Sequence, residues 1–166
     1  GAHLAEPGYI PDVPVLDLFA GAGTLGIECL SRGASWACFI ERRGPAARAL
    51  RENIRNLGAE DVCQIVQGDA LRAEIPTPPD GRYGLVFVDP PYRMTERPTP
   101  GDAVVQRIVE LGSHPAVADD ALLLLRQDEH AQRLPPMPHW TLFDERSIGT
   151  MRITTLSRGS EADASV

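Results

Sequence analysis

The sequence between positions 15 and 26 reads Val-Leu-Asp-Leu-Phe-Ala-Gly-Ala-Gly-Thr-Leu-Gly. Its first part, Val15 to Phe19, is an apolar run with one acid inside it, which is typical of a buried parallel strand. Gly21 and Gly23 follow, and a backbone without Cβ atoms can turn tightly there and approach a ligand. A helical pattern starts near Thr24. A strand, a glycine turn and a helix N-terminus together make the ligand-binding corner of a doubly wound α/β fold.

Two kinds of ligand compete for this corner. Gly21, Gly23 and Gly26 satisfy G-x-G-x-x-G, the dinucleotide fingerprint in which pyrophosphate lies on the helix N-terminus. Asp17 lies inside the strand, four residues before the first glycine, and an acid there favours a cationic ligand such as an amino acid's ammonium or a sulfonium. The glycines alone therefore leave three alternatives: S-adenosylmethionine (SAM), a nicotinamide or flavin, or a packing turn without a ligand.

Two further acids follow the next two apolar strands. Residues 36–40 form the second strand, which ends in Glu41, 18 residues beyond Gly23. An acid at that place accepts hydrogen bonds from ribose hydroxyls in doubly wound nucleotide sites, and a solvated glutamate is the alternative. Residues 62–66 form the third strand, and Asp69 follows it. Asp69 is placed to accept a hydrogen bond from an adenine amino group, to cap the next turn, or to do both.

The fourth apolar strand, residues 85–88, runs directly into Asp89-Pro90-Pro91-Tyr92. Two prolines remove backbone donors and stiffen the chain where the strand leaves the sheet. A carboxylate and a fixed carbonyl remain as acceptors, with an aromatic ring beside them. Such a corner suits a planar ligand with an exocyclic amino group, because the acceptors take the amino hydrogens while the ring stacks on the base. A structural proline turn explains the prolines but not the whole motif.

The rest of the chain is expected to complete one α/β domain over residues 15–156. Helices are predicted from Gly44 and over residues 103–111, a fifth buried strand over 121–125, and a closing β-hairpin formed by 140–143 and 151–156. The stretch 74–84 is predicted as a surface loop because it is rich in proline and glycine. Residues 93–101 have no apolar anchor and are predicted to form a mobile lip over the site, where Arg93 and Arg97 meet phosphate.

The charge balance limits how this chain can meet nucleic acid. The formal net charge is −7, and all 16 basic residues are arginines. Strong non-specific binding to nucleic acid needs clustered positive charge, which an acidic chain does not supply overall. Any activity directed at RNA must therefore use a local basic patch, a segment absent from this sequence, or a partner.

The cysteines and the hydropathy point to a cytosolic protein. Cys29, Cys38 and Cys63 are scattered in apolar contexts, so we interpret them as reduced core residues and not as a metal site or a disulfide framework. The sequence contains no apolar run of about 18 residues, which is the length of a membrane span. We therefore expect neither a membrane segment nor a bound metal.

Together these stretches resemble the RsmD-like methyltransferases. The similarity covers roughly residues 13–156 and rests on 16–23, Leu30-Ser31-Arg32-Gly33-Ala34, Glu41, Asn53, Asp69 and 89–92. That family methylates N2 of a guanine in small-subunit ribosomal RNA with SAM, on a Rossmann-like, mostly parallel sheet with a C-terminal antiparallel hairpin. N-directed methyltransferases of adenine, cytosine and glutamine share the Asp-Pro-Pro-Tyr type of corner. The phrase at 30–34, and Asp in place of Asn at the start of the corner, favour the ribosomal branch.

The resemblance implies roles for particular residues. The cofactor-binding set is Asp17, Phe19, Ala20, Gly21, Gly23, Glu41, Asp69 and Ala70. The catalytic set is Asp89, Pro90, Pro91 and Tyr92. The two glycines lie under the methionine part of SAM, and Asp17 positions its ammonium. Asp89 and the Pro90 carbonyl hold guanine N2, while Tyr92 stacks on the flipped base.

The implied partner is ribosomal RNA, within the 30S subunit or its assembly intermediate, in the cytoplasm. Alternatives are an N-methyltransferase of DNA adenine, of a protein amide or of a small amine, and a non-catalytic SAM-fold module associated with RNA. Three departures from the family also stand out. The family usually has an RNA-binding segment before the first strand, so residues 1–14 are expected to be a leader left from a truncated segment. A glutamate often follows the fifth strand where this chain has Arg126-Gln127, and Tyr-Gly in the hairpin is replaced by Ile148-Gly149. Residues 157–166 are expected to form a disordered tail.

Overall fold

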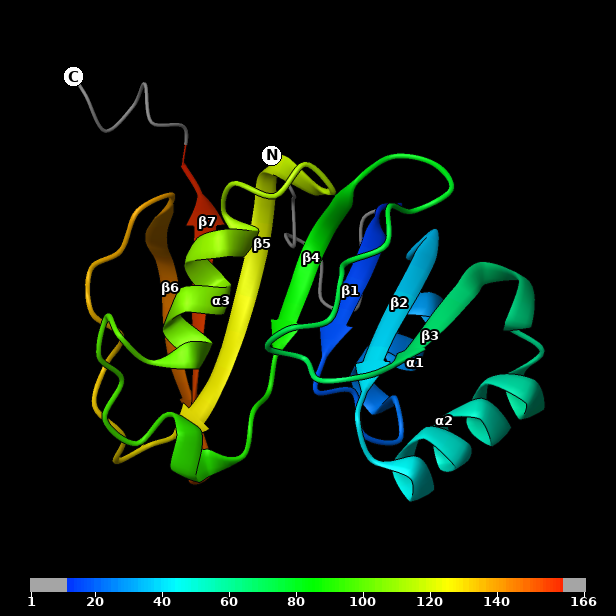
Figure 1. Ribbon diagram of the computed structural model, residues 1–166, viewed down its shortest axis with the longest axis horizontal. Coiled ribbons are helices and arrows are strands. Elements are labelled where there is room, and N and C mark those ends of the chain that lie inside the picture. Colours follow the sequence, from blue (N-terminus) through cyan, green and yellow to red (C-terminus); the bar gives the residue numbers. More distant parts are fainter. Residues whose placement is uncertain (1–11, 160–166) are drawn as a thin grey trace.

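The computed structural model describes residues 12–159, and one mixed β-sheet runs through them (Figure 1). The strands are β1 (Pro14–Leu18), β2 (Trp36–Glu41), β3 (Cys63–Gln67), β4 (Tyr83–Val88), β5 (Val117–Asp128), β6 (Trp140–Ile148) and β7 (Met151–Arg158). Their order is β3-β2-β1-β4-β5-β7-β6. The neighbours from β3 to β5 pair in parallel, whereas β7 pairs antiparallel with both β5 and β6. The predicted fold class, a mostly parallel sheet with a C-terminal antiparallel hairpin, is confirmed.

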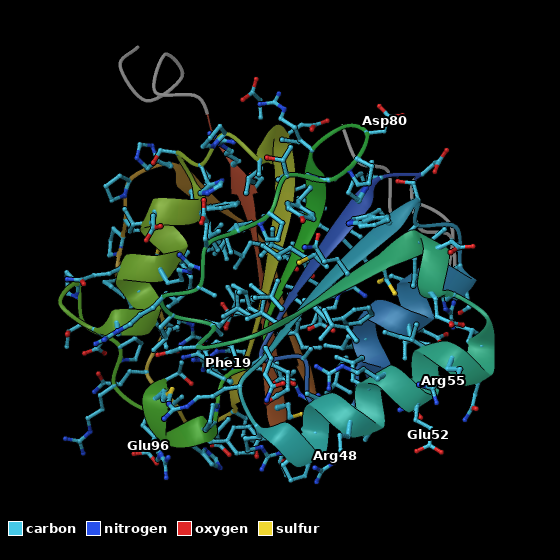
Figure 2. All side chains as sticks on the ribbon, turned by 45° about the vertical axis from the view of Figure 1, so that its right-hand side comes forward. Phe19, Arg48, Glu52, Arg55, Asp80 and Glu96 are labelled. Atoms are coloured by element: carbon cyan, nitrogen blue, oxygen red, sulfur yellow. The ribbon has the colours of Figure 1, made fainter. Side chains whose placement is uncertain are left out.

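Three α-helices within the described residues cover the two faces of the sheet. They are α1 (Thr24–Ser31), α2 (Gly44–Leu57) and α3 (Ala103–Leu111), and two short 3-10 helices, η1 (Glu60–Val62) and η2 (Tyr92–Met94), lie between elements. Helix α2 packs Leu50 and Ile54 against Phe39 of β2, on the face that it shares with α1. Its outer side carries Arg48 and Arg55, which point away from the sheet (Figure 2).

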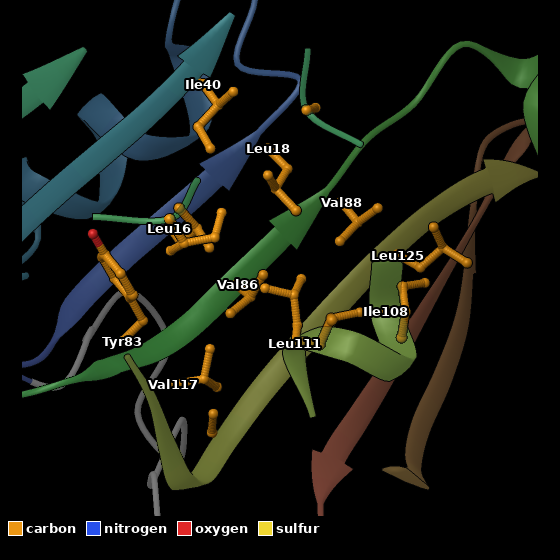
Figure 3. Close-up of a cluster of buried hydrophobic side chains, with 14 of the residues drawn as sticks. Leu16, Leu18, Ile40, Tyr83, Val86, Val88, Ile108, Leu111, Val117 and Leu125 are labelled. Atoms are coloured by element: carbon orange, nitrogen blue, oxygen red, sulfur yellow. The ribbon is translucent and has the colours of Figure 1, made fainter. Parts of the chain in front are cut away.

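The opposite face holds the larger core. Leu16 and Val86, from the neighbouring strands β1 and β4, pack with Ile108 and Leu111 of α3 (Figure 3). All four side chains are fully buried. Burial of both faces explains why these strands have nearly continuous apolar sequences. It also makes the sheet a stiff support, so the residues that follow the parallel strands are held at one edge.

The structure corrects four details of the expected layout. Strand β1 ends at Leu18, and Phe19 takes a left-handed conformation with φ 60. Strand β4 begins at Tyr83, inside the stretch predicted as a loop, because the buried Tyr83 ring packs in the core and its hydroxyl donates to the Pro76 carbonyl at 2.7 Å. Strand β5 is longer than predicted. Strand β7 continues to Arg158 because it stays paired with β6 there, so the expected tail does not begin at 157. Residues 1–11 of the expected leader and 160–166 of the expected tail lie outside the described residues.

Candidate active site

A cavity of about 770 Å³ opens at the carboxyl ends of the parallel strands. It is lined by Phe19, Gly21, Ile40, Glu41, Arg42, Arg43, Asp69, Ala70, Asp89, Pro90, Pro91, Tyr92, Arg93, Met94 and Arg126. Five strands thus contribute, which is the usual place for a ligand in an open α/β sheet. The lining includes the whole predicted catalytic set and five of the eight predicted cofactor residues. Asp17, Ala20 and Gly23 do not line the cavity.

Glu41 links the ends of β1 and β2. Its Oε1 accepts a hydrogen bond from the Gly21 amide and its Oε2 one from the Arg43 amide, each at 2.8 Å. Gly21 has φ 58, and no atom lies within 4 Å of the place where a Cβ would be. The turn therefore presents bare backbone to the cavity, and the neighbouring carboxylate is held in place by two amides.

Asp17 is buried behind the glycine turn. Its Oδ2 accepts a hydrogen bond from the Gly26 amide at 3.1 Å, and the residue is 1% exposed. A Cβ at Gly26 would lie 2.4 Å from the Phe39 ring, so a glycine is required for α1 to pack this closely on β2. Burial raises the pKa of Asp17 to about 7, the Gly26 hydrogen bond opposes that rise, and the charges of Asp89 and Glu41 add to it. The charges of Asp89 and Glu41 thus raise the pKa of Asp17, although Asp17 does not line the cavity.

Ala20 and Gly23 set the shape of the turn. The Ala20 amide donates to the Ile40 carbonyl of β2, and the Ala20 carbonyl accepts from the Gly23 amide, both at 2.9 Å. Asn53 of α2 donates from Nδ2 to the Ala22 carbonyl at 3.0 Å. Asn53 is one of the residues on which the family resemblance rests, and this hydrogen bond shows that it holds the glycine turn against α2.

Asp69 belongs to the loop after β3. Its Oδ1 accepts a hydrogen bond from the Leu71 amide at 3.0 Å, so it caps the turn, and it also lines the cavity. Arg107 of α3 fixes the same loop. It is 5% exposed, and it donates from Nε to the Ala70 carbonyl at 3.0 Å and from Nη2 to the Ala73 carbonyl. Sequence reasoning missed Arg107, because nothing in its helix pattern distinguishes it from a solvated arginine.

Asp89 and Arg126 are neighbours across β4 and β5. The register pairs Val88 of β4 with Leu125 of β5, so the residues that follow them, Asp89 and Arg126, lie side by side. Arg126 Nη1 is 3.4 Å from Asp89 Oδ2. Partial burial raises the pKa of Asp89, and the Arg126 guanidinium opposes that rise. In the sequence, Arg126 stands out only as a departure from the family pattern. Its contact with Asp89 depends on the register of β4 against β5, which the sequence does not show.

The aromatic ring of the corner stands at the cavity mouth. Tyr92 is 49% exposed and begins η2, whereas Pro90 is buried. An exposed ring in the lining of this cavity is accessible to a planar ligand that enters from solvent.

The lip predicted over residues 93–101 is anchored, contrary to the expectation of a mobile segment. Thr95 is 1% exposed, and its carbonyl accepts from Gln127 Nε2 at 3.0 Å. The Glu96 carbonyl accepts from the Gln132 amide at 2.8 Å. Arg152 Nη2 donates to Gln127 Oε1 at 3.1 Å, which fixes the amide from its other side. The anchors are polar, so an apolar pattern in the sequence does not reveal them.

The cavity is richer in arginine than the acidic chain around it. Its lining carries four arginines, Arg42, Arg43, Arg93 and Arg126, and three acids, Glu41, Asp69 and Asp89. The formal net charge of the chain is −7. The lining therefore has one arginine more than acids, and one of its arginines, Arg126, is paired with Asp89.

Within residues 12–159, no helix is long and apolar enough to cross a membrane. No group of three or more His, Cys, Asp or Glu side chains in this range is arranged to hold a metal ion. Cys29 and Cys38 are buried free thiols, and Cys63 is partly buried and also free.

The sheet order, the acids after successive strands and the Asp-Pro-Pro-Tyr corner together define a Rossmann-like methyltransferase fold. The family described as Conserved hypothetical protein 95 matches residues 4–157. The chain belongs to this family, and its resemblance to the RsmD-like methyltransferases is confirmed.

Named relatives agree with this placement. Ribosomal RNA small subunit methyltransferase D of Escherichia coli strain K12 is 31% identical over 158 residues, which span 93% of this chain and 73% of that protein. A conserved hypothetical protein of Streptococcus pyogenes superposes with a TM-score of 0.76 at 28% identity, covering 90% of this chain and 88% of that one. An RNA methyltransferase of Salinibacter ruber, in complex with S-adenosyl-L-homocysteine, has a TM-score of 0.63 at 16% identity, covers 90% of this chain and 82% of that one, and supports the fold alone.

Proposed function

We propose that this protein transfers a methyl group from SAM to N2 of a guanine in small-subunit ribosomal RNA. One observation carries the proposal: the acceptors of the Asp89 corner line the same cavity as Gly21, Glu41 and Asp69. A cofactor site and an amine site therefore share one space. The E. coli relative named as a small-subunit ribosomal RNA methyltransferase supports the same substrate class.

The cofactor half of the cavity fits SAM. Each Glu41 oxygen accepts one amide hydrogen and keeps a lone pair for a ribose hydroxyl. Asp69 Oδ1 accepts from the Leu71 amide, while Oδ2 has no donor among residues 12–159 and can accept from an adenine amino group. The open backbone at Gly21 leaves room for the methionine part of SAM. When bound, SAM supplies a methyl group on a sulfonium, whose sulfur leaves as a neutral thioether.

The substrate half supplies position more than base strength. Methyl transfer from a sulfonium is an in-line displacement, so the protein's main task is to align the attacking nitrogen. Asp89 and the Pro90 carbonyl accept the amino hydrogens and stabilise the positive charge that builds on that nitrogen. The proton is lost afterwards to Asp89 or to water. Tyr92 holds the base by stacking, which is worth about 1–3 kcal/mol per base.

The same cavity suggests how an acidic protein approaches RNA. Arg42, Arg43 and Arg93 are exposed at its rim, where they can meet phosphates beside the flipped nucleotide. A small number of phosphate contacts gives weak binding to naked RNA, and the loss of affinity in salt is shallow because its slope scales with the number of phosphates contacted. We therefore propose that the substrate is presented within the 30S subunit or its assembly intermediate, in the cytoplasm.

The test is a transfer assay with methyl-labelled SAM. Purified protein is incubated with 30S particles and free ribosomal RNA from a strain without the gene, and with DNA, a protein extract and small amines. Label in N2-methylguanosine of the ribosomal RNA is expected, together with its loss in Asp89→Ala. Label in DNA adenine, protein or a small amine contradicts the substrate. SAM binding with no transfer to any acceptor contradicts the enzyme and favours a non-catalytic module.

A further inference from the structure

We propose that Arg126 selects guanine by donating a hydrogen bond to its O6 while Asp89 accepts from the other end of the same base edge. This proposal rests on the proposed function and adds a specificity-determining residue to it. The observation behind it is the pairing of a donor and an acceptor side by side at the ends of β5 and β4, both lining the cavity.

The two side chains keep hydrogen-bonding capacity for a ligand. Asp89 Oδ2 faces Arg126 Nη1 at 3.4 Å, and no protein donor among residues 12–159 reaches Oδ1. Arg126 directs Nε toward Met151 of β7, and its Nη2 has no acceptor within the same range of residues. The Arg126 side chain is 37% exposed and that of Asp89 31%. Met151 of β7 thus contacts Arg126, while the side chains of Arg126 and Asp89 stay partly exposed in the cavity.

The donors and acceptors on the edges of the bases explain how Asp89 and Arg126 select guanine. An acceptor corner such as Asp89 with the Pro90 carbonyl binds any exocyclic amine, so it does not by itself distinguish guanine from adenine or cytosine. Guanine presents a donor, a donor and an acceptor along one edge, from N2 through N1 to O6. Adenine held by its 6-amino group instead has the acceptors N1 and N7 directly beside that group and no acceptor at the far end of the edge. A cation placed at the distance of O6, and not at that of the atom beside the amine, therefore favours guanine over adenine.

The strand order places Arg126 on the substrate side. The cofactor residues Glu41 and Asp69 lie at the end of β2 and after β3, on one side of β1, whereas Asp89 follows β4 and Arg126 lies near the end of β5, on the other side. Arg126 is therefore farther from the proposed ribose and adenine positions than from the amine. An arginine remains charged at any physiological pH, so this donor is always present.

The test uses a ribosomal RNA substrate whose target guanosine, mapped by the labelling assay, is replaced by 2-aminopurine. This base keeps the amine at C2 but lacks both O6 and the N1 hydrogen, so the O6 contact is isolated by comparing wild type with Arg126→Met on both bases. Single-turnover rates are measured for wild type, Arg126→Met and Arg126→Lys, with Arg133→Met as control, because Arg133 is exposed and lies outside the cavity. Equal SAM affinity in all four proteins shows that the cofactor half is intact.

We expect wild type and Arg133→Met to methylate guanine roughly 10- to 100-fold faster than 2-aminopurine, the range of one base-specific contact. Arg126→Met should lose this preference by slowing on guanine alone, and Arg126→Lys should keep part of it. Equal slowing on both bases would mean that Arg126 only positions Asp89, and it overturns the proposal. So does a wild type that does not discriminate. If the wild-type protein methylates neither RNA, the proposed function is refuted, and the proposed selection of guanine is refuted too.

A salt titration separates base reading from phosphate binding. If Arg126 met a phosphate, Arg126→Met would reduce the slope of log binding against log salt by about 0.7–0.9. Base reading leaves this slope unchanged, and that is the result expected. A reduced slope, with preference for guanine retained, overturns the assignment of Arg126 to the base.

Discussion

The carboxylate of Glu41 accepts the amide hydrogen of Gly21 at 2.8 Å, across the gap between the ends of β2 and β1. The contact means that one acid has two tasks. It shapes the glycine turn from the side, and it faces the cavity where the ribose of SAM is proposed to lie. Substitutions at Glu41 must therefore be designed to separate these tasks.

Glu41→Ala should weaken SAM binding roughly 10- to 100-fold, because ribose hydroxyls and two backbone amides lose their acceptor, at a cost of about 1–3 kcal/mol. Glu41→Gln keeps one carbonyl oxygen for the turn and should give an intermediate affinity. Isothermal calorimetry measures both. Affinities equal to wild type would remove Glu41 from the cofactor site.

Asp89→Ala should leave SAM affinity nearly unchanged and reduce single-turnover methylation by about 100-fold or more, the scale of a lost transition-state contact. The reason is position, because Asp89 follows β4 and contacts Arg126 of β5, away from Glu41 and Asp69. SAM titrations and quenched reactions on the same protein give both numbers. Full turnover by the variant would mean that the Asp-Pro-Pro-Tyr corner is only a structural turn.

Tyr92 tests stacking separately from hydrogen bonding. Its ring is 49% exposed at the cavity mouth. Tyr92→Phe keeps the ring and should retain most activity, whereas Tyr92→Ala loses base stacking worth about 1–3 kcal/mol and should raise KM for RNA. Equal inactivation of both variants would show that the hydroxyl matters and that stacking is the wrong role.

Asp17 predicts a pH dependence of stability. Its pKa in the folded protein is about 7, against an ordinary value of 3.8, so the folded state holds a proton that the unfolded state releases between these values. The associated stability is complete below pH 3.8 and is lost as the pH rises to about 7. Asp17→Asn cannot ionise, and its amide oxygen can still accept from Gly26. Denaturant unfolding should therefore show the variant gaining on wild type by roughly 2–4 kcal/mol from pH 4 to 7.5. Parallel pH profiles would contradict this assignment.

Much of the fold follows from local pattern. Short apolar runs ended by Glu41, Asp69 and Asp89 predict parallel strands whose polar ends gather at one edge, and the structure has them there. Gly58 ends α2 with φ 69, in the left-handed conformation expected at a helix C-terminus. Such features depend on neighbours in sequence, so sequence alone reveals them.

The parts that sequence missed depend on three-dimensional neighbours. Asp17 looked like a cavity residue, but its side chain turns back to the Gly26 amide. The approach of Arg126 to Asp89 requires the register of β4 against β5, which no local pattern encodes. The left-handed Phe19 is also invisible in sequence, because a residue with a Cβ rarely adopts that conformation and tertiary contacts must hold it there.

Methylation of guanine N2 in small-subunit ribosomal RNA can be measured in cells by nucleoside mass spectrometry. Ribosomal RNA is compared from a wild-type strain, a strain without the gene, and that strain carrying either the gene or its Asp89→Ala variant. We expect deletion to lower N2-methylguanosine in the small-subunit RNA, the intact gene to restore it, and the variant not to restore it. An N2-methylguanosine level unchanged by deletion would contradict the proposed function.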